Sequence, residues 1–306
     1  MARMKQIALI GTTASGKTAL AIELAQHFGG IILSLDSLAV YRHIDIASAK
    51  PTPKERGDIP HFGIDVFEPH ETFDATVFLQ LYQEAYRQAS AKQVPLLIVG
   101  GTGFYLKMLL EGISPRPDID AAVIAQARRM ACDGSGYRAL QTVDADYAAR
   151  IQPTDRYRIQ KGLEIYLATH LTPTEYFAAH PPVSPLKGKL ALFEIVWDRQ
   201  ALRQRIASRT QAMLEQGLID EVAELERRYT RRPNCMKAIG IKETLAYLDG
   251  LYDKDRLVEA ITTHTAQLAK RQQTFNKTQF HNIFRGDLSS VKDAALQVLQ
   301  SQCGIF

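Results

Sequence analysis

An eight-residue stretch near the start of the chain has the pattern of a phosphate-binding loop. It reads GTTASGKT, fits G-x-x-x-x-G-K-[ST], follows an apolar run and opens a segment with helical periodicity. In such a loop backbone N–H groups converge on phosphate oxygens, the lysine adds charge and the last hydroxyl can ligate magnesium. The predicted phosphate-binding residues are Gly11, Thr12, Thr13, Ala14, Ser15, Gly16, Lys17 and Thr18, with Thr18 as the Mg²⁺ ligand. A nucleotide is the default ligand, and a diphosphate leaving group fits as well.

Two polar residues follow predicted strands and could act beside this loop. Asp36 comes directly after the strand-like residues 31–35, and Thr102 lies in a Gly-Gly-Thr-Gly turn after a third apolar run. The carboxyl ends of parallel strands border the ligand crevice, so both side chains are expected there. Asp36 suits a helix cap and a catalytic carboxylate equally, and Thr102 suits a turn residue or a phosphate-contacting hydroxyl. The run before Thr102 does not end in an acidic residue, which disfavours an ATPase motor.

Arg209 is a basic residue on an otherwise apolar helix face. Counting 100° per residue places it in one stripe with Leu202, Ile206 and Met213. An inward guanidinium needs an anionic partner, which is either a structural carboxylate or an anion in the phosphate loop.

The last long helix is predicted to present basic residues on its outer face. Its inward stripe consists of Leu257, Ile261, Leu268 and Phe275. The same counting places Lys270 and Lys277 outward and Arg271 at the border. The outer lysines could contact a phosphate backbone, although such clusters are often simply solvated.

Apolar runs alternate with helical segments along the first hundred residues. The predicted strands are residues 5–10, 31–35 and 94–101, and the predicted helices are residues 18–28 and 75–91. Near-continuous apolar strands of this kind are typical of a parallel sheet buried on both faces.

The middle of the chain reads differently. From residue 119 to about 170 it shows short helices separated by Gly, Pro and Asp, and residues 189–197 resemble a return to the sheet. Asp198 is predicted to cap a long helix, and the remainder is predicted to be helical. We therefore predict an α/β fold. Its parallel-sheet core with the phosphate loop comprises residues 1–113 and 185–306, and a mostly helical insertion domain comprises residues 114–184.

Composition limits the class of protein. The chain has 306 residues, is 46% hydrophobic and carries a net charge of +4, which is typical of an ordinary globular protein. Cys132, Cys235 and Cys303 stand far apart without a partner at metal-site spacing, so we expect neither disulfides nor structural zinc. No apolar stretch approaches the roughly 18 residues of a membrane span. We expect a cytoplasmic monomer with no membrane partner.

Six segments occur in a distinctive order. They read GTTASGKT, LDSLAVYRHIDIASAKP, PLLIVGGTGFYLK, DRYRIQKGLEIY, KAIGIKE and QLAKRQQTF. Together they resemble the bacterial tRNA dimethylallyltransferases over roughly residues 5–280. The resemblance implies transfer of a dimethylallyl group from dimethylallyl diphosphate to N6 of the adenosine at tRNA position 37, beside the anticodon, in tRNAs that read codons beginning with U.

The resemblance also implies roles for individual residues. The loop residues 11–18 would hold the diphosphate with Mg²⁺, and Asp36 would be the general base. Thr102 would hydrogen-bond the departing ester oxygen, and Arg209 would lie beside the diphosphate. The implied tRNA-binding residues are Asp36, Ser37, Leu38, Ala39, Gln160, Lys161, Gly162, Leu163 and Glu164, to which the basic helix adds Lys270, Arg271 and Lys277. These roles suit the chemistry, because the exocyclic amine of adenine is a poor nucleophile that must lose a proton as the bond forms.

Four positions depart from the usual family pattern. The family usually has proline at Thr12, methionine at Leu38, glutamine at Ala39 and tryptophan at Phe275, and the glutamine is thought to help hold the adenosine. Alternative functions are a small-molecule kinase that uses ATP, a prenyltransferase for free adenine nucleotides, and a nucleotide-gated RNA-binding module without chemistry.

Overall fold

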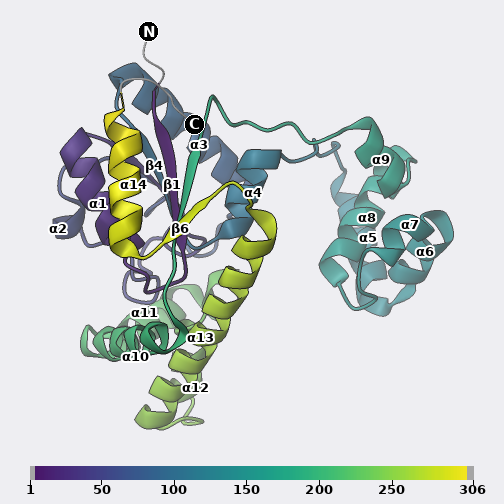
Figure 1. Ribbon diagram of the computed structural model, residues 1–306. Coiled ribbons are helices and arrows are strands. Elements are labelled where there is room, and N and C mark those ends of the chain that lie inside the picture. The colour runs from purple at the N-terminus through teal and green to yellow at the C-terminus, as the bar shows by residue number, and fades with distance from the viewer. Residues whose placement is uncertain (1–3, 302–306) are drawn as a thin grey trace. The chain divides into compact units, whose positions relative to one another are not determined.

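The computed structural model describes residues 4–301, which form two compact units (Figure 1). Unit 1 is the chain up to Leu110 and from Pro185 onward, and unit 2 is Glu111–Ser184. Cys132 and Cys235 are free, and Cys303 lies outside the described residues. Within residues 4–301, no helix has both the length and the apolar character needed to cross a membrane.

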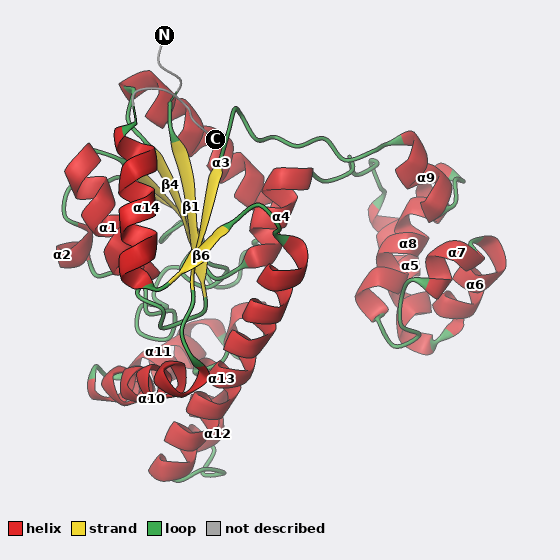
Figure 2. Cartoon of the chain, in the orientation of Figure 1, coloured by secondary structure: helices red, strands yellow, loops and turns green. Residues whose placement is uncertain are grey.

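Unit 1 is built on a six-stranded sheet in which all neighbouring strands are parallel (Figure 2). The strand order is β3-β2-β4-β1-β5-β6. The strands are β1 (Gln6–Gly11), β2 (Ile31–Leu35), β3 (His61–Phe62), β4 (Leu96–Gly100), β5 (Ala191–Ile195) and β6 (Phe284–Gly286). The predicted α/β fold class is confirmed.

One expectation about the end of the chain is wrong. The region after Asp198 is not all helical, because β6 pairs with β5 at the edge of the sheet. A strand of three residues is too short to leave a periodic signal in the sequence. The two residues of β3, at the opposite edge, escaped prediction for the same reason.

Helices cover both faces of the sheet. One face packs against α3 (Ala75–Lys92) and α4 (Gly103–Glu111), and the other packs against α1 (Lys17–Phe28) and α14 (Leu288–Gln300). Along β1, Ala8 and Ile10 face the first set of helices, whereas Ile7 and Leu9 face the second. Burial on both faces explains the near-continuous apolar runs of the strands.

A helical layer lies beyond the end of the sheet at which β1 runs into the phosphate loop (Figure 1). Its elements are α10 (Arg199–Glu215), α11 (Leu218–Tyr229), the 3₁₀-helix η1 (Asn234–Lys237), α12 (Ile241–Leu248) and the first part of α13 (Lys254–Gln279); a short helix α2 (Pro53–Arg56) precedes β3. Asp198 caps α10 as predicted, since its Oδ1 accepts hydrogen bonds from the N–H groups of Gln200 and Ala201 at 2.8 and 3.0 Å.

The long helix α13 changes partners along its length. Leu257 and Ile261 are buried in the core of the helical layer, as predicted. Leu268 and Phe275 are only half-buried, and the neighbouring Ala269 and Asn276 take the buried positions. The stripe shifts because the start of α13 packs mainly with α11 and α12, whereas Ala269, further along, packs against Leu202 and Ile206 of α10. Phe280, which follows α13, packs against the sheet.

Unit 2 is a small helical body with a core of its own. Its helices are α5 (Ala121–Asp133), α6 (Ser135–Val143), α7 (Ala145–Ala149), α8 (Arg156–Thr169) and α9 (Pro173–Ala179). The core contains Ala127, Leu140, Ile159 and Leu163. Helix α8 passes so close to α7 that a Cβ at Gly162 would lie 2.6 Å from the Tyr147 ring.

Candidate active site

The phosphate loop connects β1 to α1, as the sequence pattern requires. Gly11 has a φ of +154° and a Cβ there would lie 2.9 Å from the carbonyl oxygen of Ile195, so the position needs glycine. Gly16, at φ +93°, is the N-cap of α1. Lys17 folds back and donates a hydrogen bond from Nζ to the Thr12 carbonyl at 2.9 Å.

Two side chains hold the loop from its outer side. The Trp197 Nε1 donates to the Ser15 carbonyl at 3.0 Å, and the Arg205 Nε donates to the Ala14 carbonyl at 2.7 Å. The Arg205 guanidinium also stacks on the Trp197 ring, 4.4 Å from its centroid. Because C=O and N–H of a trans peptide point in opposite directions, the bond from Trp197 to the Ser15 carbonyl turns the N–H of Gly16 away from Trp197.

The loop, Asp36, Thr102 and Arg209 line one pocket of about 410 Å³ in unit 1. Asp36 follows β2, Thr102 follows β4 and Arg209 lies on α10, so three separate elements converge there. The predicted residues that line the pocket are Thr13, Lys17, Thr18, Asp36, Ser37, Leu38, Ala39, Thr102 and Arg209. A second hollow of about 1580 Å³ also borders Lys17, Thr18 and Arg209, so a ligand on the loop has two approaches.

Asp36 caps a turn, so the helix cap offered by the sequence is wrong, and it lines the pocket, where its catalytic role stays a prediction. Its Oδ1 accepts hydrogen bonds from the N–H groups of Leu38 and Ala39 at 2.8 and 3.1 Å, which caps a turn rather than a helix. Among residues 4–301 no hydrogen bond reaches its Oδ2. The carboxylate is therefore fixed at the pocket while one oxygen stays available to a ligand.

The charges in the pocket favour a multivalent anion. Burial, and then the neighbouring Arg209, lower the pKa of Lys17 to about 8, although Asp36 acts in the opposite direction. Burial also lowers the pKa of Arg209, against the opposing charge of Asp36. Two desolvated cations near a single carboxylate leave an excess of positive charge, which an anion such as a diphosphate would neutralise.

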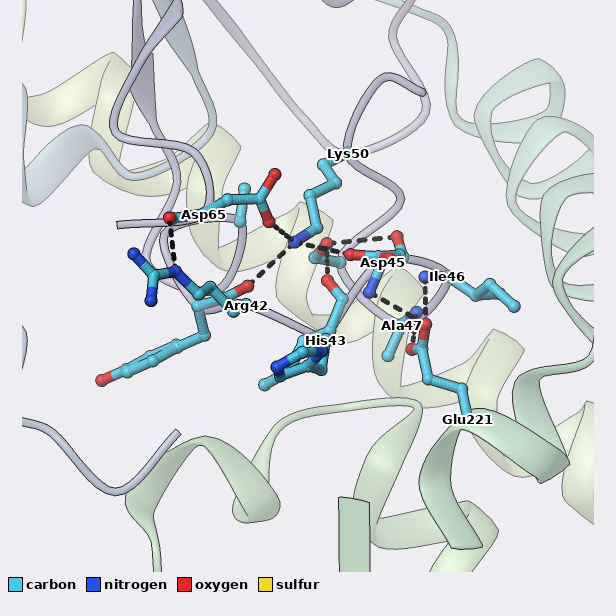
Figure 3. Close-up of polar contacts among 12 residues, drawn as sticks. Arg42, His43, Asp45, Ile46, Ala47, Lys50, Asp65 and Glu221 are labelled. Carbon is cyan, nitrogen blue, oxygen red and sulfur yellow. Dashed lines mark hydrogen bonds and ion pairs between the residues drawn. The ribbon is translucent and has the colours of Figure 1, made fainter. Parts of the chain in front are cut away.

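The residues 36–51 loop forms another wall of the pocket and is held by a distant carboxylate. Glu221 on α11 accepts hydrogen bonds from the successive N–H groups of Asp45, Ile46 and Ala47 at 2.9, 2.7 and 2.9 Å (Figure 3). Burial raises the pKa of Glu221, whereas the three N–H groups counteract that rise. Ala39 and Ala47 on this loop line the pocket. Sequence analysis missed Glu221, because it lies 174 positions after Ala47.

Lys50 braces the same loop from within (Figure 3). Its side chain is only 3% exposed, and its Nζ pairs with Asp45 at 2.7 Å and with Asp65. The Nζ also donates to the carbonyl of Tyr41 at 2.8 Å, which ties the end of the loop to its middle. Lys50 stands in the segment LDSLAVYRHIDIASAKP, but nothing in that pattern indicated a buried cation.

A further missed residue, Gln272 on α13, contacts both the phosphate loop and the turn that carries Thr102. The helical count offered a signal for it, since Gln272 lies four positions after the inward Leu268.

The other predicted tRNA-binding residues are spread over both units. Lys270, Arg271 and Lys277 are exposed on α13. On α8 of unit 2, Gly162 and Leu163 are buried, and Glu164 is only 1% exposed. The Glu164 carboxylate accepts hydrogen bonds from Gln160, Lys161 and Arg116. Because Glu164 is already paired, only the less buried side chains of this segment could contact RNA. Those roles remain predictions.

Comparisons with known proteins agree with the motifs. The model of the IPP transferase family matches residues 39–279, and that of the isopentenyl transferase family matches residues 4–59. A tRNA dimethylallyltransferase of Sulfurovum sp. is 52% identical over 96% of this chain and 98% of its own length. One from Wolinella succinogenes is 50% identical over 92% and 94%.

Solved structures are similar over the same extent. A eukaryotic dimethylallyltransferase acting on tRNA gives a TM-score of 0.82 at 26% identity, covering 98% of this chain and 77% of that one. A tRNA isopentenylpyrophosphate transferase from Bacillus halodurans gives 0.70 at 27% identity, covering 98% of each chain. These matches confirm the resemblance found in the sequence.

Proposed function

The chain belongs to the IPP transferase family and is a prenyltransferase, and from this premise we propose that it transfers a dimethylallyl group from dimethylallyl diphosphate to tRNA. The acceptor is N6 of the adenosine at position 37, beside the anticodon, in tRNAs that read codons beginning with U. The observation that carries the proposal is the convergence of the phosphate loop, Asp36, Thr102 and Arg209 on one pocket.

The donor side of the pocket suits a diphosphate ester. Backbone N–H groups of the loop, Lys17 and Arg209 offer positive charge where the leaving group develops negative charge. When the allylic C–O bond breaks, its electron pair leaves with the diphosphate. The hydroxyl of Thr102, on the neighbouring turn, donates a hydrogen bond to the departing ester oxygen.

The acceptor side suits a proton transfer. The adenine N6 attacks the allylic carbon and forms the new C–N bond as the C–O bond breaks, and Asp36 accepts the proton that N6 loses. The two N–H bonds to Oδ1 keep the carboxylate at the pocket during this step. The adenosine must leave the stack of the anticodon loop to reach it, and single-stranded loops permit such extrusion.

Magnesium fits the same residues. Mg²⁺ keeps most of its waters and binds substrate phosphates with few protein ligands, so a hydroxyl at the loop suffices. Thr18 at the start of α1 would supply it, and residues 4–301 contain no His, Cys, Asp and Glu cluster that suits a metal of another class. When bound, the ion would neutralise charge on the diphosphate.

The proposed location of the protein follows from its tRNA substrate. Since the acceptor is tRNA, we propose that the protein works in the cytoplasm without a membrane partner. We also propose that it acts as a monomer, as expected from the sequence.

The direct test is product formation. The protein is incubated with Mg²⁺, dimethylallyl diphosphate and an unmodified tRNA transcript, and the digested nucleosides are identified by mass spectrometry. We expect N6-(dimethylallyl)adenosine from this tRNA and none from a matched transcript with guanosine at position 37. Product on adenosine monophosphate but not on tRNA, or no product from folded protein that binds pyrophosphate, would refute the proposal. A parallel arm with ATP reports kinase activity.

A further inference from the structure

Gln272 bonds to two separate loops of the pocket with one amide group. Its Oε1 accepts a hydrogen bond from the N–H of Thr13, in the phosphate loop, at 3.1 Å. Its Nε2 donates to the carbonyl of Gly101, in the turn that carries Thr102, at 3.0 Å. The backbone partners, one a donor and one an acceptor, decide which end of the amide is oxygen.

The two loops leave the sheet side by side. In the sheet, Ile10 at the end of β1 pairs with Gly100 at the end of β4, and Gly100 pairs with Leu35 of β2. Beyond the last pair, the N–H of Thr102 donates to the Leu35 carbonyl at 3.1 Å, which ties the turn to β2. Gln272 ties the same turn to the loop that follows β1, on its other side.

The helix that carries Gln272 is fixed one turn further on. Asn276 is 1% exposed, and its Nδ2 donates to Glu194 of β5 at 2.8 Å. The other oxygen of Glu194 accepts from Arg285 Nε at 2.8 Å, and Arg285 also donates to the Asn276 carbonyl at 3.1 Å. Glu194 pairs with Ile10 of β1, so this buried network sets α13 against the strand that feeds the phosphate loop.

The turn lies so close to α13 that a Cβ at either of its glycines would displace the end of a side chain on the helix. A Cβ at Gly101 would lie 2.5 Å from the Gln272 Nε2, and a Cβ at Gly103 would lie 2.6 Å from the Asn276 Oδ1. With the Gln272 amide removed, the next atom recorded near a Gly101 Cβ is the Gly11 carbonyl oxygen at 3.4 Å, an ordinary contact. The amide of Gln272 is therefore the main group that leaves no space for a side chain at position 101.

We propose that Gln272 is a positioning residue that fixes the separation of the phosphate loop and the turn carrying Thr102. The inference rests on the proposed function. A diphosphate held by the loop and an ester oxygen contacted by Thr102 belong to one donor molecule, so the two loops must stay in register for the C–O bond to break. Gln272 acts through Thr13 and Gly101 and does not itself touch the reacting atoms.

The position of Gln272 on α13 predicts which kinetic constant changes. Lys270 and Arg271 precede it directly and are exposed on the outer side of the helix, where we predict tRNA contacts. Loss of the amide leaves those cations in place, so it should lower the rate of transfer and not the affinity for tRNA. A misplacement of about 1 Å can cost on the order of 100-fold in rate.

A double-mutant cycle with Gly101 tests the proposal. The variants are Gln272→Ala, Gly101→Ala and the double variant, with Gln273→Ala on the same helix as the control, and each is checked for folding by its melting temperature.

Single-turnover transfer is measured at saturating dimethylallyl diphosphate, and the Kd for tRNA is measured separately. We expect Gln272→Ala and Gly101→Ala each to slow transfer roughly 10- to 100-fold, and the double variant to be no more than about threefold slower than Gln272→Ala. The Kd for tRNA and the Gln273→Ala rate should stay near wild type.

The proposal has an independent readout that needs no prenyl transfer. Exchange of the Thr13 amide hydrogen should become faster in Gln272→Ala and in Gly101→Ala, because both lose the bond to Oε1. If the wild-type protein modifies no tRNA, the proposed function fails while this exchange still reports on the positioning contact. Multiplicative effects of the two substitutions, an equal loss of tRNA affinity, or unchanged exchange at Thr13 would each overturn the role of Gln272.

Discussion

The phosphate loop and the residues 36–51 loop line the same pocket but owe their shapes to different parts of the chain. The first has a local framework, formed by its own glycines and by the hydrogen bond from Lys17 to Thr12, five residues away, and distant side chains such as Trp197 only add hydrogen bonds to it. The second is held by Glu221, which lies 174 to 176 positions from its partners, and by the pairing of Lys50 with Asp65. A local motif can specify an anion site. The residues 36–51 loop, which forms the wall of the pocket on the tRNA side, takes its shape only when the helical layer has folded.

The largest effect is expected from the locally determined loop. Lys17→Met removes a buried cation that faces the leaving group, so we expect transfer to fall roughly 10³-fold and pyrophosphate binding to weaken. The affinity for tRNA should hardly change, because the substitution leaves the 36–51 loop intact. Single-turnover rates and a filter-binding Kd for tRNA measure the two effects. An equal loss of tRNA affinity would show that the phosphate loop and the 36–51 loop do not act independently on donor and tRNA binding.

Stability should depend more on the contacts of Lys50, which braces the 36–51 loop from within. Lys50→Met leaves Asp45 and Asp65 without their shared cation and frees the Tyr41 carbonyl. Because Asp45 is largely exposed, we expect the free energy of unfolding to fall by about 1–3 kcal/mol rather than by the full cost of a broken buried pair. Urea denaturation measures it, with Lys54→Met on the exposed side of α2 as the control. A loss no larger than that of the control would contradict the role of Lys50 as a brace.

A substitution at Glu221 should best separate the effect of the 36–51 loop on tRNA kinetics from the effect of the phosphate loop on donor binding. Glu221→Gln replaces one acceptor oxygen by an NH₂ group that confronts backbone N–H groups, so the loop should shift. We expect kcat/KM for tRNA to fall about tenfold, equivalent to about 1.4 kcal/mol, with the KM for dimethylallyl diphosphate unchanged. Glu224→Gln, on the exposed side of the same helix, is the matched control. A changed KM for dimethylallyl diphosphate with normal tRNA kinetics would show that the 36–51 loop serves the donor and not tRNA.

The smallest effect concerns protonation of the phosphate loop. The pKa of Lys17 is lowered to about 8, mainly by burial, so the free protein loses this proton as the pH rises through 8. A bound diphosphate favours the protonated form, and binding above pH 8 must take up a proton. We therefore expect affinity for dimethylallyl diphosphate, measured without tRNA, to fall several-fold between pH 7.5 and 9.5. Constant affinity over this range would mean that Lys17 is charged throughout.

The sequence predicted the parts of the site that have local causes. The spacing of Gly11, Gly16 and Lys17, the position of Asp36 after a strand and the inward turn of Arg209 were all visible, and each lines or shapes the pocket. Glu221 was not predicted, since it meets its partners only after the helical layer has folded onto the 36–51 loop. Lys50 was not predicted, since the irregular chain around it gives no periodic signal that its side chain is buried. Helix α13 was placed correctly near its start, but its stripe shifted where its packing partners changed.

The central claim is that Asp36 removes the adenine proton while the phosphate loop holds the donor, and Asp36→Asn tests it most directly. Asparagine keeps an oxygen for the N–H groups of Leu38 and Ala39, so the turn should survive and only the base is lost. The measurement is the single-turnover rate of prenyl transfer, with pyrophosphate affinity determined on the same protein. The account predicts a rate at least about 100-fold below wild type with pyrophosphate affinity no weaker than wild type. A wild-type rate in this variant would contradict it.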